Sequence, residues 1–85
     1  MTPFLTALTE AIYTERRTTA WPQRLELAPD LHARFQREAR AALQDLAVVP
    51  VLVGSIAGVP VIQRDSVGAA MVRADGMRVP ITVPA

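Results

Sequence analysis

The chain has 85 residues, which is the length of one ordinary domain, so we expect a single domain over residues 1–85. It contains no cysteine and one histidine, which excludes disulfides and metal sites built from thiolates or from several imidazoles. Nine basic against eight acidic residues give a formal net charge of +1, which argues against a dedicated nucleic-acid-binding protein.

Two amphipathic helices are predicted in the first half of the chain. They cover residues 3–17 and 29–46, because apolar residues recur in both at spacings of three and four. Thr2 and Pro29 stand where a helix begins, the first as a capping hydroxyl and the second as a proline in the first turn. The apolar stripes consist of Leu5, Leu8 and Ile12, and of Leu31, Phe35, Ala39, Ala42, Leu43 and Leu46.

Short strands are predicted between and after the helices. Residues 24–28 alternate between polar and apolar, which is typical of a half-buried strand. Asp75-Gly76 between two apolar runs is typical of a hairpin. The later strands are expected at residues 48–53, 59–64, 69–73 and 77–83, with a turn at 54–58. The order helix, strand, helix and three or four strands predicts an α+β domain with two helices packed on a small, mainly antiparallel sheet.

One uncharged stretch, residues 46–62, approaches the length of a membrane-spanning helix. It contains two prolines, two glycines and several β-branched residues, so two short strands and a turn are the better prediction. We therefore expect no membrane partner.

Residues with catalytic potential are isolated from one another. His32 is the only histidine, and neither Ser55 nor Ser66 lies in a nucleophile pattern. The carboxylates come singly, and the glycines form no phosphate-binding spacing. The sequence therefore predicts no enzymatic activity, no cofactor and no metal site.

Contacts with other chains are predicted at three places. Trp21 lies in a connection between elements, where a large aromatic either covers the core or anchors a neighbour. Arginines repeat every three residues on the second helix, which is consistent with a solvated face, a subunit contact or a phosphate contact. The proline-containing strands at 48–53 and 78–84 are the third place. The predicted interface residues are Trp21, Arg34, Arg37, Val51, Val53 and Ile81.

Two segments resemble the peripheral domain of the tailed-phage major capsid fold, which encapsulin shells share. Residues 25–35 are similar to the family's strand that ends in a small residue and a proline and then opens a helix. Residues 51–62 resemble its Gly-x-Pro-Val strand, through Gly58 to Val61. A whole shell subunit is several times longer, so the resemblance implies a stand-alone relative of the peripheral domain.

The expected function is therefore that of a non-enzymatic structural protein, a small component of a phage or phage-derived virion that forms homo-oligomers or contacts other virion proteins. The alternative is a small adaptor or regulatory domain in the bacterial cytoplasm that binds a single protein partner. Nucleic acid is not an expected partner under either reading. Stoichiometry separates the two, because one forms a large repeating assembly and the other a dimer or a heterocomplex.

Overall fold

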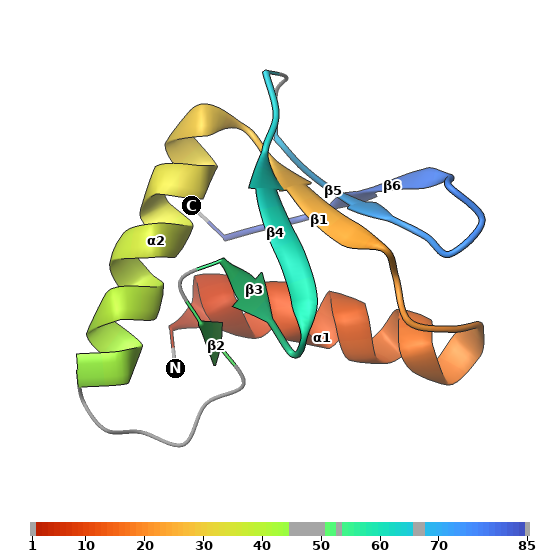
Figure 1. Ribbon diagram of the computed structural model, residues 1–85, viewed down its shortest axis with the longest axis horizontal. Coiled ribbons are helices and arrows are strands. Elements are labelled where there is room, and N and C mark those ends of the chain that lie inside the picture. Colours follow the sequence, from red (N-terminus) through yellow and green to blue (C-terminus); the bar gives the residue numbers. More distant parts are fainter. Residues whose placement is uncertain (1, 45–50, 53, 66–67, 85) are drawn as a thin grey trace.

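The computed structural model describes residues 2–44, 51–52, 54–65 and 68–84. In these residues two helices pack against one face of a six-stranded sheet (Figure 1), which confirms the predicted α+β class and the order of elements. The elements are α1 (Pro3–Thr18), β1 (Arg24–Leu27), α2 (Pro29–Gln44), β2 (Val51–Leu52), β3 (Ser55–Ile56), β4 (Val59–Gln63), β5 (Ala69–Val72) and β6 (Arg78–Ile81).

The sheet is built around β1. Its strand order is β2-β3-β4-β1-β5-β6, so β1 lies between β4 and β5 (Figure 1). The pair β1 and β4 is parallel, with Leu25 opposite Val61, because α2 and the β2–β3 hairpin carry the chain back to the start of the sheet. The other neighbouring strands run antiparallel, which confirms the mainly antiparallel sheet.

Both helices begin where the sequence predicts. The amide of Leu5 donates to the hydroxyl of Thr2 at 3.2 Å, and Pro3 occupies the first helical position, where a missing amide hydrogen costs nothing. Helix α1 extends one residue beyond the predicted 3–17. Helix α2 begins at Pro29 as predicted and is described to Gln44, while the last two positions of the prediction lie outside the described residues.

The prediction of a turn over residues 54–58 is wrong in part. Ser55 and Ile56 form β3, which pairs with β4 around a two-residue connection. That connection is Ala57-Gly58, and both residues have positive φ, 52° and 81°. Two successive positive φ angles close a hairpin in its shortest form, so the flanking residues remain free to pair. Of the strand predicted at 48–53, Val51–Leu52 are described and form β2.

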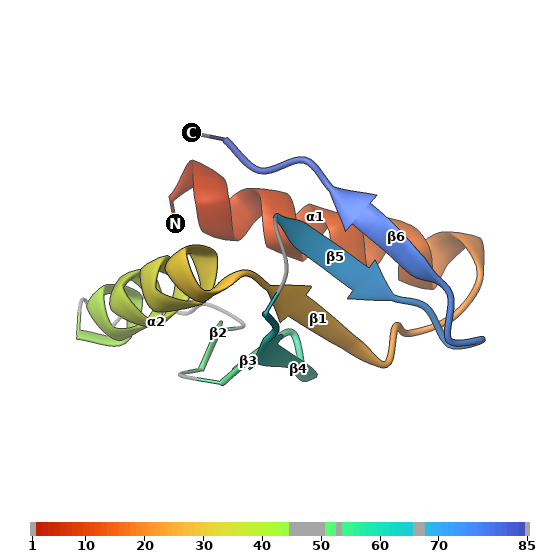
Figure 2. The same ribbon diagram turned by 90° about the horizontal axis from the view of Figure 1, so that it is seen from above.

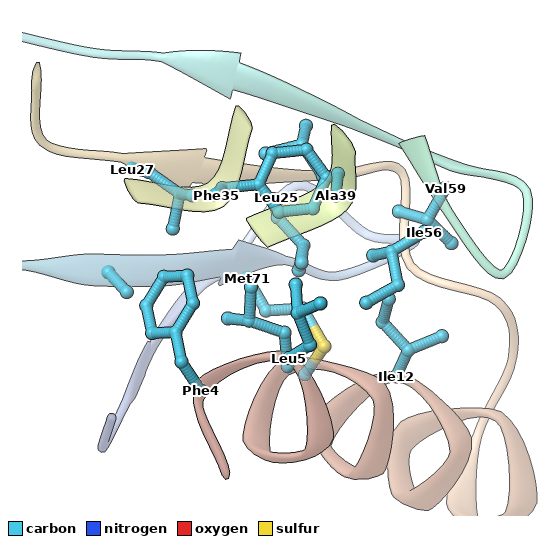
Figure 3. Close-up of a cluster of buried hydrophobic side chains, with 13 residues drawn as sticks. Phe4, Leu5, Ile12, Leu25, Leu27, Phe35, Ala39, Ile56, Val59 and Met71 are labelled. Carbon is cyan, nitrogen blue, oxygen red and sulfur yellow. The ribbon is translucent and has the colours of Figure 1, made fainter. Parts of the chain in front are cut away.

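The core fills the space between the helices and one face of the sheet (Figure 3). Phe35 and Ala39 of α2 are fully buried against Leu25 and Leu27 of β1. Helix α1 contributes its own fully buried residues, which are Phe4, Leu5, Leu8 and Ile12. Leu43, a later member of the predicted α2 stripe, is 39% exposed, and the buried residues of α2, Phe35 and Ala39, both precede it.

No helix in the described part of the chain is long and apolar enough to cross a membrane. Within the uncharged stretch at 46–62, the described residues form β2, β3, most of β4 and the turns that join them.

Candidate functional site

One face of the sheet is left uncovered by the helices. In Figure 2 the strand β6 crosses in front of α1, and neither helix lies over the strands β1, β5 and β6 on the side turned to the viewer. Side chains alternate between the faces of a strand, so the residues in register with Glu26 point to this face while Leu25 and Leu27 point into the core. We call this surface the open face. Its residues are Arg24 and Glu26 of β1, Ile62 of β4 with Arg64 just after it, Ala70 and Val72 of β5, and Arg78 and Pro80 of β6.

Glu26 lies in the middle of the open face and is only 5% exposed. Its Oε1 accepts hydrogen bonds from Nη1 of Arg64 and from Nε of Arg78, both at 2.7 Å. Its Oε2 accepts from Nε of Arg24 at 3.2 Å. The three arginines come from β1, the end of β4 and β6, so the strand order of the sheet brings together residues that are far apart in the chain. We call these four residues the Glu26 cluster.

The Glu26 cluster carries an excess of positive charge. The hydrogen bond from Arg78 is the largest cause that lowers the pKa of Glu26 to about 2, with Arg64 and Arg24 adding to it and burial opposing it. Glu26 is therefore ionised at neutral pH, and three guanidiniums against one carboxylate leave +3 − 1 = +2. The side chains of Arg24, Arg64 and Arg78 are 34%, 40% and 50% exposed, so the charge reaches the solvent.

Apolar side chains surround this charge. Ile62 stands directly beside Glu26 in the register and is 39% exposed. Val72 lies between Arg24 and Arg78 in the register and is only 2% exposed, because the aliphatic stems of such long side chains cover what lies beneath them. The open face is thus an apolar surface with a fixed cationic centre.

Trp21 lies outside the core, at the connection between α1 and β1. It is 45% exposed, its ring centroid is 6.2 Å from that of Tyr13, and the guanidinium of Arg16 lies 4.9 Å from its centre. The tilted contact with the Tyr13 ring and the cation–π contact hold the Trp21 ring in one place, while almost half of the residue stays accessible. Beside it, Pro22 and Gln23 line a shallow hollow together with the β3–β4 turn.

The other exposed large apolar residues lie at separate places. Met77, in the β5–β6 hairpin, is 58% exposed, and Leu43, near the end of α2, is 39% exposed. The α1–β1 connection and the β5–β6 hairpin lie toward one end of the long axis, whereas the end of α2 lies at the other (Figures 1 and 2). The longest extent of the molecule is 35 Å, so exposed Trp21 and Met77 are well separated from exposed Leu43.

The two arginines predicted as interface residues have different surroundings. Arg34 donates from Nε to Glu38 at 2.7 Å and from Nη1 to the carbonyl oxygen of Pro84 at 3.1 Å. Its guanidinium also lies 4.4 Å from the centre of the Phe4 ring. Arg34 therefore joins α2, the start of α1 and the segment after β6. Arg37 is exposed on α2.

The predicted strand residues lie on opposite edges of the sheet. Val51 belongs to the edge strand β2, and Val53 lies outside the described residues. Ile81 is half-buried in the other edge strand, β6, where it packs on the core and lines an open groove against α1. The predicted interface residues therefore do not form one continuous surface.

The Glu26 cluster is absent from the residues predicted from the sequence. A usable signal is present, because Arg24, Glu26, Arg64 and Arg78 all stand at polar positions of predicted strands or at their ends. Among the described residues, no three His, Asp or Glu side chains gather as they would around a metal ion, and His32 is half-buried on α2. No family model, curated protein or solved structure matches this chain.

Proposed function

We propose that the protein functions without catalysis, as a structural component of a phage or phage-derived particle that joins copies of itself end to end. One observation carries this proposal, namely that exposed large apolar side chains lie at both ends of the long axis. Exposed apolar surface is what protein contacts bury, and a rigid aromatic such as Trp21 is a typical anchor.

The two ends differ in structure, and this sets the type of contact. One end carries Trp21 with its shallow hollow, and the other carries Leu43 on a helix. A contact between unlike surfaces is heterologous, so after one contact each copy still has its other end available, and the contact repeats until a ring closes or a filament extends. The resemblance of residues 25–35 and 51–62 to the peripheral domain of the tailed-phage capsid fold suggests a virion as the setting.

Complementation between two variants tests the proposal. Trp21→Ala removes the anchor at one end, and Leu43→Glu places a charge at the other. Each variant alone is expected to be monomeric by light scattering, because each lacks one partner surface. An equal mixture is expected to form heterodimers, since the intact Leu43 end of the first variant meets the intact Trp21 end of the second.

Ile62→Ala is the matched control, because Ile62 is as exposed as Leu43 but lies on the open face. This variant is expected to assemble like the parent chain. If Trp21→Ala or Leu43→Glu assembles like the parent, the proposal is contradicted. A mixture that stays monomeric contradicts the end-to-end arrangement, and a parent chain that is itself monomeric favours the alternative, an adaptor for a single partner.

A further inference from the structure

The Glu26 cluster has hydrogen-bonding capacity that the described part of the chain does not use. A guanidinium has five N–H donors, and each arginine of the cluster bonds Glu26 through a single nitrogen. Arg24 uses one further donor, on the side chain of Gln23 at 3.4 Å. Within the described residues, Glu26 is the only carboxylate in an ion pair with these three arginines. The three arginine side chains are 34–50% exposed, so a ligand can reach them.

Glu26 also prepares these arginines for a ligand. A long side chain normally loses conformational entropy when it binds, and a partner that already holds it in place reduces that cost. Three guanidiniums fixed around one buried carboxylate therefore form a cationic site whose geometry exists before any ligand arrives. Exposed Ile62 beside it excludes some water and strengthens a charged contact.

The open face lacks what single-stranded nucleic acid requires. Binding sites for single-stranded nucleic acid combine positive charge with aromatic rings on which bases stack. The chain has four aromatic residues, one Trp, one Tyr and two Phe. Phe4 and Phe35 are fully buried in the core, while Tyr13 and Trp21 contact each other at α1 and the connection after it. The open face is therefore more suitable for carboxylates than for bases.

A second copy of this chain is a poor occupant for the same site. Two open faces in contact would place a charge of +2 against a charge of +2. Among the described residues, no three Asp, Glu or His side chains gather in one place, so another surface of a second copy does not offer a cluster of carboxylates. Several guanidiniums side by side match several carboxylates on one segment.

We propose that the open face binds a carboxylate-rich segment of another protein, with Arg24, Arg64 and Arg78 as its anchors. Arginine forks bind carboxylates in a bidentate, directional manner, so the three side chains select for acidic groups. The end-to-end proposal takes Trp21 and Leu43 as its contact residues, and neither of them is an anchor of this site.

The probe is a fluorescein-labelled oligo-glutamate peptide, titrated with the full chain and followed by fluorescence anisotropy at low ionic strength. The double variant Arg64→Gln with Arg78→Gln changes the formal charge of the chain from +1 to −1 and removes two anchors. Arg37→Gln with Arg40→Gln on α2 makes the same change of charge away from the open face and serves as the matched control. We expect the Kd to rise about tenfold or more in the open-face variant and clearly less in the control.

A second measurement uses the unaltered chain and does not depend on whether a variant folds. In ¹⁵N-correlated NMR spectra, the peptide is expected to shift the Nε–Hε signals of Arg24, Arg64 and Arg78 while those of Arg37 and Arg40 stay in place. Absence of binding, equal loss in both double variants, or shifts confined to α2 would overturn the proposal. Tighter binding of single-stranded oligothymidylate with the same arginine dependence would overturn it in favour of nucleic acid. The monomeric Trp21→Ala variant separates the two proposals, because it is expected to bind the peptide as the parent does.

Discussion

Replacing Glu26 by glutamine tests whether the Glu26 cluster stabilises the fold. The substitution keeps the shape of the side chain and removes its charge, which leaves three guanidiniums around a neutral amide. The pKa of Glu26 is lowered from 4.5 to about 2. At about 1.36 kcal/mol per pKa unit, this corresponds to an upper limit of about 3.4 kcal/mol in the free energy of unfolding. The arginines are 34–50% exposed and solvent screens their charge, so we expect about 2 kcal/mol at neutral pH.

The lowered pKa of Glu26 determines how the difference in stability between the parent and Glu26→Gln changes with pH. A carboxylate whose pKa is lower in the folded state stabilises the fold fully above its unfolded pKa and loses that contribution as the pH falls through the folded value. The difference in unfolding free energy between the parent and Glu26→Gln is therefore expected to be constant above about pH 4.5 and to close as the pH falls toward about 2.

Urea denaturation followed by circular dichroism, repeated across this pH range, measures that difference. Glu10→Gln is the control, since Glu10 is exposed on α1 and forms no ion pair within the described residues. It is expected to change the stability by less than about 0.5 kcal/mol. A Glu26→Gln variant as stable as the parent at neutral pH, or a difference that does not change down to about pH 2, would refute the role given to the cluster.

Three further substitutions have defined expectations. Phe35→Ala is expected to lower the free energy of unfolding by about 3–5 kcal/mol in urea denaturation, because it leaves a cavity at a fully buried site. An unchanged denaturation midpoint would contradict the placement of Phe35 in the core. Ala57→Asn is expected to raise the free energy of unfolding by about 0.5–1 kcal/mol, since Asn-Gly suits a connection with two positive φ angles, and a loss of stability would contradict that turn. Trp21→Ala is expected to abolish assembly while costing no more than about 1 kcal/mol in unfolding, and a larger loss would make Trp21 a core residue.

Much of the fold follows from local patterns in the sequence. The start of α1 is determined by Thr2 and Pro3, which act on the backbone within one turn. The β5–β6 hairpin is likewise local, because the amide of Met77 donates to Oδ1 of Asp75 at 2.9 Å and Gly76 takes a φ of 91°. Within the turn predicted at 54–58, the strand β3 was missed, because its two-residue connection to β4 requires Ala57 to take a positive φ that alanine seldom adopts.

The candidate site depends on distant residues and is correspondingly harder to predict. Glu26 and its partners Arg64 and Arg78 are 38 and 52 positions apart, and their contact requires the strand order and register of the sheet. Arg34, in contrast, was predicted as an interface residue, because arginines repeat every three residues along its helix. In the structure its donors are used by Glu38 and Pro84 within the chain.

The mass of the purified chain in solution, measured by light scattering over a dilution series, tests the central claim most directly. End-to-end assembly through Trp21 and Leu43 predicts masses that are multiples of the monomer, with larger species at higher concentration and a shift toward the monomer on dilution. A monomer at every concentration, or a dimer that never grows further, would contradict a heterologous, repeating contact.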